Sequence, residues 1–472
     1  MPPRSFHLIG IAGTGMGAFA GLLKQAGYEV RGSDENVYPP MSDKLRDWGI
    51  EARTPYAPEN LDPPADVVVV GNVIRKVNVE ATAMRERGLA HASFPETLGE
   101  LFLSRRHSVV VAGTHGKTTT STLLAHTLLE AGRDPGFLIG GIPQSLGESF
   151  RVGRDDPACP FVVEGDEYDT AYFDKGPKFL HYRPRSLLAT SLEYDHADIY
   201  QDVSEIQARF TQLFELVPEE GHLVCYAGDP ALSEALERAG KRARVETYGD
   251  EGADWTLANL DEDAAGLRFE ALHQGQSEGA LKVPLSGRHG ALNALGAYAI
   301  LRGLGLSHDD VARGYASFAG VKRRMEVVGE TDGVLVLDDF AHHPTAVKTT
   351  LEGARARYRG RPLWALFEPR SATSCRKVFQ AAYAEAFDAA DRVLLAPTGR
   401  SLDPEEALDV QELARDVTAR GVPALAASSI DALVEVARDE APGGAVLLCM
   451  SNGAFGGIHR KLLDALAARA AK

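Results

Sequence analysis

Residues 113–120 have the types and spacing of a phosphate-binding loop. They read GTHGKTTT, follow the apolar run 108–112 and precede a stretch with helical periodicity over 121–131. Glycines let backbone N–H groups converge on phosphate oxygens, and the positive end of a helix dipole stabilises the bound anion. We therefore predict that ATP binds here, with Lys117 bridging the β- and γ-phosphates and the Thr118 hydroxyl facing Mg²⁺. The predicted ATP-binding residues of this loop are Gly113, Thr114, His115, Gly116, Lys117, Thr118 and Thr119.

The loop departs from the standard GxxxxGK[ST] pattern, because Val111 stands where the first glycine belongs. Metal ligands for such a loop are expected at the ends of neighbouring strands. Glu164 directly follows the apolar run 160–163, and His196 follows the run 186–192 within a few residues. We expect Thr118 and Glu164 to hold one Mg²⁺, and His196 to ligate a second Mg²⁺ or to orient a nucleophile. A solvated acidic loop and an ordinary loop histidine are the alternatives.

A second glycine-rich turn lies near the N-terminus, at residues 10–17. Its sequence, GIAGTGMG, resembles the dinucleotide-binding fingerprint but reads strictly as GxAxxG. Asp34 follows about 20 residues later, as a ribose-binding acid does. The same turn suits any nucleoside diphosphate, and a purely structural turn is the alternative. The candidate ligand-binding residues are Ala12, Gly13, Thr14, Gly15, Met16, Gly17, Ser33 and Asp34.

The elements that must position these loops alternate along the whole chain. Short apolar runs are separated by amphipathic stretches, a pattern typical of βαβ units and parallel sheets. With 472 residues and about 150 residues per domain, we predict three α/β domains. Their predicted bounds are 1–105, 106–322 and 323–472. The expected strands are 6–11, 29–32, 66–71, 108–112, 160–163, 186–192, 334–337, 362–367, 392–395 and 445–450.

Composition and charge exclude several classes of protein. The chain is 25% charged and 44% hydrophobic, as expected of packed globular domains. A net charge of −16 argues against nucleic acid or an anionic membrane as the partner. The four cysteines show no CxxC spacing, which argues against disulfides or structural zinc and favours a reducing compartment. No apolar run approaches the ~18 residues of a membrane span. We expect a cytoplasmic protein of undetermined oligomeric state.

The order of these features along the chain resembles that of the Mur ligases. Three more segments are similar to motifs of that family, namely 287–293 (GRHGALN), 321–326 (VKRRME) and 338–345 (DDFAHHPT). The resemblance implies that Asn293 contacts the adenine region, Arg324 reaches the ATP phosphates and Asp339 lies on the ribose side. Gly290 and Phe340 depart from the asparagine and tyrosine that are usual in the family.

The resemblance also implies a fold and an activity. A Rossmann-like first domain would bind a UDP-sugar, a central P-loop ATPase-type domain would bind ATP, and a Rossmann-like third domain would bind an amino acid or peptide. ATP would phosphorylate the sugar carboxylate, and an amine would attack the acyl phosphate, so that no protein nucleophile is needed. The expected catalytic residues are Lys117, Glu164, His196 and Arg324, with ATP and Mg²⁺ required.

Further runs resemble the family member that recycles a peptide, namely 164–175 (EGDEYDTAYFDK), 367–371 (FEPRS) and 450–459 (MSNGAFGGIH). They predict UDP-N-acetylmuramate and free L-alanyl-γ-D-glutamyl-meso-diaminopimelate as substrates, in peptidoglycan recycling. Arg370 is expected to bind a peptide carboxylate, since a guanidinium contacts it bidentately. His342, Ser451 and Asn452 complete the expected peptide site. The alternatives are the L-alanine-adding ligase, a P-loop ATPase without ligase activity, a hydride-transfer enzyme and a non-catalytic UDP-sugar sensor.

Overall fold

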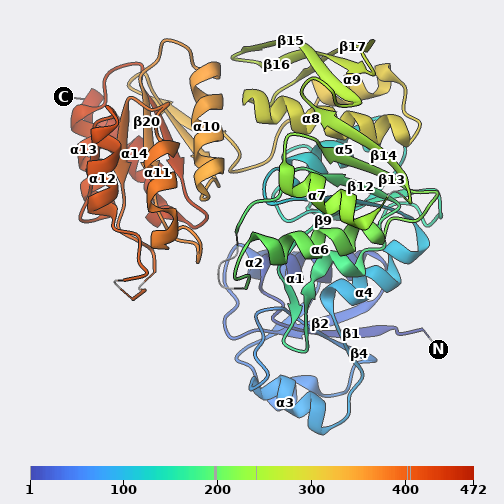
Figure 1. The fold of residues 1–472 in the computed structure, drawn as a ribbon. Coiled ribbons are helices and arrows are strands. Elements are labelled where there is room, and N and C mark those ends of the chain that lie inside the picture. The colour runs from blue at the N-terminus through green and yellow to red at the C-terminus, as the bar shows by residue number, and fades with distance from the viewer. Residues whose placement is uncertain (1, 196–198, 241, 401, 404, 472) are drawn as a thin grey trace.

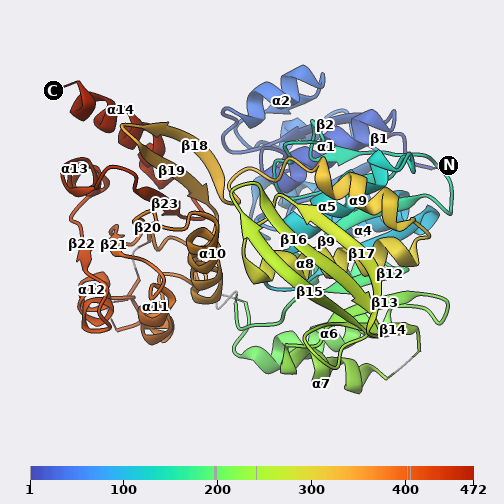
Figure 2. The ribbon, with the colours of Figure 1, turned by 90° about the horizontal axis from the view of Figure 1, so that it is seen from above.

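The computed structural model describes residues 2–195, 199–240, 242–400, 402–403 and 405–471. The chain forms three α/β domains, each built around its own main sheet (Figure 1). The C-terminal domain stands beside the other two, and its helix α10 (Pro344–Arg357) faces the central domain in both views (Figures 1 and 2). The three-domain α/β fold predicted from the sequence is confirmed.

The N-terminal sheet is parallel, with strand order β3-β2-β1-β4-β5. Its strands are β1 (Ser5–Ile9), β2 (Glu29–Ser33), β3 (Glu51–Arg53), β4 (Val67–Val70) and β5 (His91–Ser93), and its helices are α1 (Thr14–Gln25), α2 (Met41–Asp47), α3 (Val79–Glu86) and α4 (Phe94–Leu101). Helix α1 begins at Thr14, before its apolar periodicity becomes visible. The reason is that glycines 15 and 17 carry no apolar side chain, although Gly17 is buried against Met41 where a Cβ would clash.

The central sheet has the strand order β17-β16-β15-β14-β13-β12-β6-β9-β7-β8. It is parallel from β15 to β7 and ends in antiparallel pairs at both edges. Its strands are β6 (His107–Ala112), β7 (Gly136–Leu138), β8 (Phe150–Arg151), β9 (Pro160–Gly165), β12 (Ser186–Ala189), β13 (His222–Tyr226), β14 (Arg244–Gly249), β15 (Trp255–Asp263), β16 (Gly266–His273) and β17 (Gln276–Val283). Its helices are α5 (Lys117–Glu130), α6 (Val203–Glu215), α7 (Pro230–Ala239), α8 (Gly287–Gly303) and α9 (His308–Ala316), and a small hairpin pairs β10 (Asp169–Ala171) with β11 (Asp174–Pro177).

The C-terminal sheet has the strand order β18-β19-β23-β20-β21-β22, with only the β18–β19 pair antiparallel. Its strands are β18 (Glu326–Thr331), β19 (Val334–Asp339), β20 (Leu363–Phe367), β21 (Arg392–Leu395), β22 (Ala424–Ala426) and β23 (Val446–Met450). The helices that accompany α10 are α11 (Gln380–Ala386), α12 (Val410–Ala419), α13 (Ile430–Glu440) and α14 (Ile458–Ala470). Short 3₁₀ helices occur at Pro58–Leu61, Leu103–Arg105, Lys178–His181, Lys377–Phe379 and Phe455–Gly457. No helix among the described residues is long and apolar enough to cross a membrane.

The hydrophobic cores divide the molecule differently from the sheets. One core runs without a break from the N-terminal domain into the central domain, where Phe150 on β8 meets the Trp48 ring at 5.0 Å and lies against Gly21 of α1. The C-terminal sheet packs its two faces into separate cores of its own. The first two domains therefore form one packed body, beside which the third domain sits.

Candidate active site between the central and C-terminal domains

The phosphate loop lies between β6 and α5, as the sequence predicted. Gly113 and Gly116 adopt φ values of 142° and 83°, which favour glycine, and a Cβ on Gly116 would clash with the Asn293 side chain. The loop therefore needs both glycines. Helix α5 begins at Lys117, so its unpaired N–H groups lie at the loop, as anion binding requires.

Lys117 is partly buried beside a carboxylate that the sequence did not single out. Its Nζ lies 2.9 Å from Glu167 Oε2 and donates to the Gly113 carbonyl at 2.5 Å. Burial lowers the pKa of Lys117, but the charges of Glu167 and Asp166 outweigh burial and raise it. The site thus holds a fixed positive charge. Nothing in the acidic run 164–169 distinguishes Glu167 from its neighbours, so only the fold identifies this partner.

Thr118 and Glu164 place two oxygen atoms together. Thr118 Oγ1 donates to Glu164 Oε2 at 3.0 Å, and Glu164 Oε1 accepts from the Gly140 N–H at 2.7 Å. Glu164 lies inside β9 rather than after it, and burial raises the pKa of its carboxyl group. A hydroxyl and a carboxylate beside a phosphate loop fit a hard divalent cation such as Mg²⁺. His196, the predicted ligand of a second Mg²⁺, lies outside the described residues.

A cavity of about 640 Å³ opens beside the loop, between the central and C-terminal domains. It brings together nearly all of the predicted ATP-binding residues that come from distant parts of the chain. Gly113 does not line the cavity, although its carbonyl accepts from Lys117. The predicted residues that do line it are Thr114, His115, Gly116, Lys117, Thr118, Thr119, Glu164, Asn293, Arg324, Asp339, His342 and Asn452.

The linker into the C-terminal domain carries two arginines against one ring. The guanidinium groups of Arg323 and Arg324 lie 5.1 and 5.2 Å from the Phe340 ring centroid. Arg324 is exposed and lines the cavity, whereas Arg323 contacts Asp338 and the carbonyls of Ser451 and Gly453. Arg323 therefore anchors the linker to the C-terminal sheet, and Arg324 stays available to a ligand.

Asp339 is held in place by the linker and by its own loop. Its carboxylate accepts from the backbone N–H groups of Met325 and Ala341, each at 2.8 Å. Burial raises the pKa of this carboxyl group. The contacts of Asp339 within the protein fix the path of the linker at the mouth of the cavity.

The predicted peptide residues differ in how available they are. The Arg370 side chain is about half exposed and passes Gly399 and Gly453, where any Cβ would collide with it. Asn452 Oδ1 is buried and accepts no hydrogen bond from the part of the chain that is described. The Ser451 hydroxyl, by contrast, already donates to Glu368 at 2.5 Å and accepts from the Gly453 N–H. Arg370 and Asn452 are thus the better placed for a ligand.

His342 is a neutral imidazole in this cavity. Its Nδ1 lies 3.0 Å from the Phe340 carbonyl oxygen and so carries the proton, which leaves a lone pair on Nε2. Burial lowers the pKa of His342.

The glycine turn of the N-terminal domain lies at the carboxyl ends of β1 and β2. Asp34 Oδ2 accepts from the Ala12 N–H at 2.9 Å, and Oδ1 accepts from the Tyr56 hydroxyl. Ser33 is fully buried and bonded to Glu80 and His7. Within the predicted set, Met16, Gly17 and Ser33 are buried, Ala12 and Asp34 are partly exposed, and Gly13, Thr14 and Gly15 are exposed. The exposed turn is the part that a ligand can reach.

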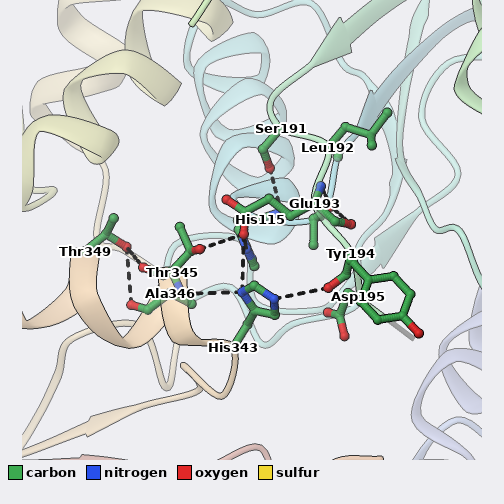
Figure 3. Close-up of polar contacts among 12 residues, drawn as sticks. His115, Ser191, Leu192, Glu193, Tyr194, Asp195, His343, Thr345, Ala346 and Thr349 are labelled. Carbon is green, nitrogen blue, oxygen red and sulfur yellow. Dashed lines mark hydrogen bonds and ion pairs between the residues drawn. The ribbon is translucent and has the colours of Figure 1, made fainter. Parts of the chain in front are cut away.

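A polar cluster joins the phosphate loop to the C-terminal domain (Figure 3). Glu193 Oε2 lies 3.3 Å from both His115 Nε2 and His343 Nδ1, and it accepts from Thr345 Oγ1 at 2.6 Å. The carboxylate therefore touches both domains at once. The sequence indicated His115 but missed Glu193 and His343, because residues 115, 193 and 343 belong to separate motifs that only the fold brings together.

Comparison with known proteins agrees with this arrangement. Residues 5–106 match the model described as "Mur ligase family, catalytic domain", 111–301 match "Mur ligase middle domain", and 323–453 match "Mur ligase, glutamate ligase domain". The chain is 39% identical to the UDP-N-acetylmuramate–L-alanyl-gamma-D-glutamyl-meso-2,6-diaminoheptandioate ligase of Escherichia coli, over 98% of both proteins. It is 31% identical to the UDP-N-acetylmuramate–L-alanine ligase of Clostridium kluyveri, over 95% of this chain and 96% of that protein.

A solved structure extends the agreement to three dimensions. The crystal structure of a murein peptide ligase from Psychrobacter arcticus 273-4 superposes with a TM-score of 0.72 at 36% identity, covering 98% of this chain and 99% of that one. The family resemblance read from the motifs is therefore confirmed over the whole length. The chain belongs to the Mur ligase family.

Proposed function

We propose that this protein is an ATP-dependent ligase that joins UDP-N-acetylmuramate to the free tripeptide L-alanyl-γ-D-glutamyl-meso-diaminopimelate. The observation that carries the proposal is the 39% identity, over 98% of both chains, to the Escherichia coli ligase named for this substrate pair. The match to an alanine-adding ligase is weaker, at 31%. The murein peptide ligase of known structure supports the same assignment.

The site favours a reaction that brings anions together. The substrate carboxylate attacks the γ-phosphorus of ATP, ADP leaves, and a mixed carboxylic–phosphoric anhydride forms. The peptide amine then attacks the acyl carbon, phosphate leaves, and the amine gives up a proton. Both the triphosphate and the attacking carboxylate are negative, so the charges of Lys117 and Arg324, which line the cavity, stabilise the transfer.

Nucleotide binding would redistribute the contacts of Lys117. In the structure its ammonium is paired with Glu167, and a triphosphate on the loop would compete for the same charge. Thr118 and Glu164 would hold one Mg²⁺ and His196 a second, and the two ions would supply additional charge neutralisation. Asn293 and Asp339 line the same cavity and would contact the nucleoside.

The other substrates are assigned to the flanking domains. The exposed turn 13–15 with Asp34 would hold the diphosphate and ribose of the UDP-sugar. Arg370 would bind a carboxylate of the peptide, and Asn452 Oδ1 and His342 Nε2 would accept hydrogen bonds from its N–H groups. The domain bounds 1–105, 106–322 and 323–472 follow this division of labour and stay predictions.

The proposal is tested by offering the purified protein two acceptors in parallel. Mg·ATP and UDP-N-acetylmuramate are supplied with either the free tripeptide or free L-alanine, and the products are identified by mass. We expect UDP-muramyl-tripeptide with one ADP and one phosphate released per product. Product with L-alanine alone would move the chain to the biosynthetic ligase, and ATP hydrolysis without either product would reject ligase activity.

A further inference from the structure

The cluster of His115, Glu193 and His343 has the composition and spacing of a transition-metal site. The three ligand atoms His115 Nε2, Glu193 Oε2 and His343 Nδ1 lie within 4.8 Å of one another. Both histidine nitrogens are 3.3 Å from the carboxylate oxygen. Bonds of about 2.0–2.1 Å at tetrahedral angles place neighbouring ligand atoms about 3.3–3.4 Å apart. The two distances from Glu193 Oε2 to the histidine nitrogens already have that value.

The protonation of His343 leaves a position for a cation. Its Nε2 lies 3.2 Å from the Tyr194 carbonyl oxygen, which can only accept, so Nε2 carries the hydrogen. In the neutral ring, Nδ1 therefore carries the lone pair, and it lies 3.3 Å from the Glu193 carboxylate oxygen. It also accepts from the Thr345 N–H at 3.4 Å, a long hydrogen bond that a bound cation would replace.

The surroundings resemble the outer shell of known metal centres. Ligating histidines commonly donate their second ring N–H to a backbone carbonyl, as His343 does to Tyr194 (Figure 3). The Glu193 oxygen is oriented by the Thr345 hydroxyl at 2.6 Å. His115 is held by its own backbone N–H, which donates to Ser191 Oγ at 2.9 Å. Each ligand is thus positioned by a neighbour outside the trio.

We propose that His115, Glu193 and His343 bind one divalent transition-metal ion of the zinc type, which joins the phosphate loop to the C-terminal domain. Two imidazoles and one carboxylate favour Zn²⁺ over Mg²⁺, which prefers oxygen ligands. His115 and Glu193 also line the cavity beside the phosphate loop. This site is distinct from the oxygen pair of Thr118 and Glu164 and does not depend on the ligase assignment.

Metal binding to the intact, metal-stripped protein tests the proposal. Zn²⁺ is titrated by calorimetry in excess Mg²⁺, and Co²⁺ is used as a probe because tetrahedral sites give it intense visible absorption. We expect one ion per chain, with affinity at least 10-fold lower in Glu193→Gln and in His343→Gln. The matched control is His273→Gln, which alters a histidine 3.2 Å from Glu246, far along the chain from the trio. The control should bind like the parent protein.

Two variants from different elements guard against a folding defect, and each is checked by its thermal midpoint. A folded Glu193→Gln or His343→Gln protein that binds Zn²⁺ as tightly as the parent would overturn the proposal. Displacement of Zn²⁺ by Mg²⁺ at comparable concentration would also overturn it, because it would place the ion on oxygen ligands. If one variant is unfolded, His115→Gln on the phosphate loop replaces it in the same titration.

Discussion

The central domain meets its two neighbours through interfaces of different character. Toward the N-terminal domain it shares one hydrophobic core, with Phe150 and Trp48 in ring contact at 5.0 Å. Toward the C-terminal domain the contacts are mixed: Glu193 accepts from Thr345 at 2.6 Å, Asp195 accepts from Thr373 at 2.6 Å, and the Tyr194 ring stacks on Phe379 at 6.1 Å.

The two interfaces should therefore differ in the free energy that is needed to separate them. A fully buried large apolar side chain contributes about 1.5–3 kcal/mol, and separating such an interface would expose all of it to water. Each polar contact contributes only about 0.5–1.5 kcal/mol net, because water can replace the partner. The cavity beside the phosphate loop lies at this second interface.

The largest expected effect comes from removing the Lys117 ammonium group, which lines the cavity between the central and C-terminal domains. Lys117→Ala should lower kcat for ligation on the order of 10³-fold, because the fixed cation at the phosphate loop is lost. The Kd of the UDP-sugar should change by less than about 2-fold, because that ligand is assigned to the N-terminal domain. Initial rates and equilibrium binding measure the two quantities. Retained turnover would remove Lys117 from the mechanism.

The next largest effect is expected from weakening the apolar interface between the N-terminal and central domains. Phe150→Ala should lower the free energy of unfolding by about 3–5 kcal/mol, because it leaves a cavity where Trp48 and Gly21 pack. Urea unfolding followed by tryptophan fluorescence measures the change. Val378→Ala in the C-terminal domain, at a side chain 68% exposed, is the control and should change stability by less than about 0.5 kcal/mol. Equal losses in the two variants would contradict the comparison.

A smaller effect is expected from removing one hydrogen bond between the central and C-terminal domains. Thr373→Val removes the hydroxyl that donates to Asp195 across the domains and should weaken docking of the C-terminal domain by about 1 kcal/mol. Small-angle scattering should then show a larger radius of gyration, and KM for the peptide should rise several-fold with little change in the thermal midpoint. Thr211→Val is the control, since its hydroxyl bonds only within helix α6. An unchanged radius would show that this contact does not hold the domains.

The sequence predicted the parts of the molecule that local physics determines. Apolar runs located the ten predicted strands but missed others, among them the antiparallel strands β15–β17, whose burial alternates with exposure. The glycines and GKT of 113–118 located the phosphate loop, because that signal lies in consecutive residues. The contact of Lys117 with Glu167 could not be predicted, because the sequence does not distinguish among the acids of 164–169. Only the path of the chain after β9 decides which of them meets Lys117. The Glu193–His343 contact joins residues about 150 positions apart and depends on how two domains dock.

The last expected effect is a pH dependence of the body that the N-terminal and central domains form. His107 opens β6, and burial, with the charge of Arg185, lowers its pKa to about 4 from 6.5. Below pH 6.5 His107 therefore binds a proton in the unfolded chain but not in the folded chain. The free energy of unfolding then falls as the pH drops from 6.5 to 4. Urea unfolding at pH 7.5 and pH 5 should show this loss, and His107→Gln should reduce it because glutamine does not titrate. Docking of the C-terminal domain, followed by scattering at the same two pH values, should not respond to this substitution, since His107 bonds to Ser186 within the central sheet. An equal effect on docking would mean that the two interfaces are mechanically coupled through β6 and the loop that follows it.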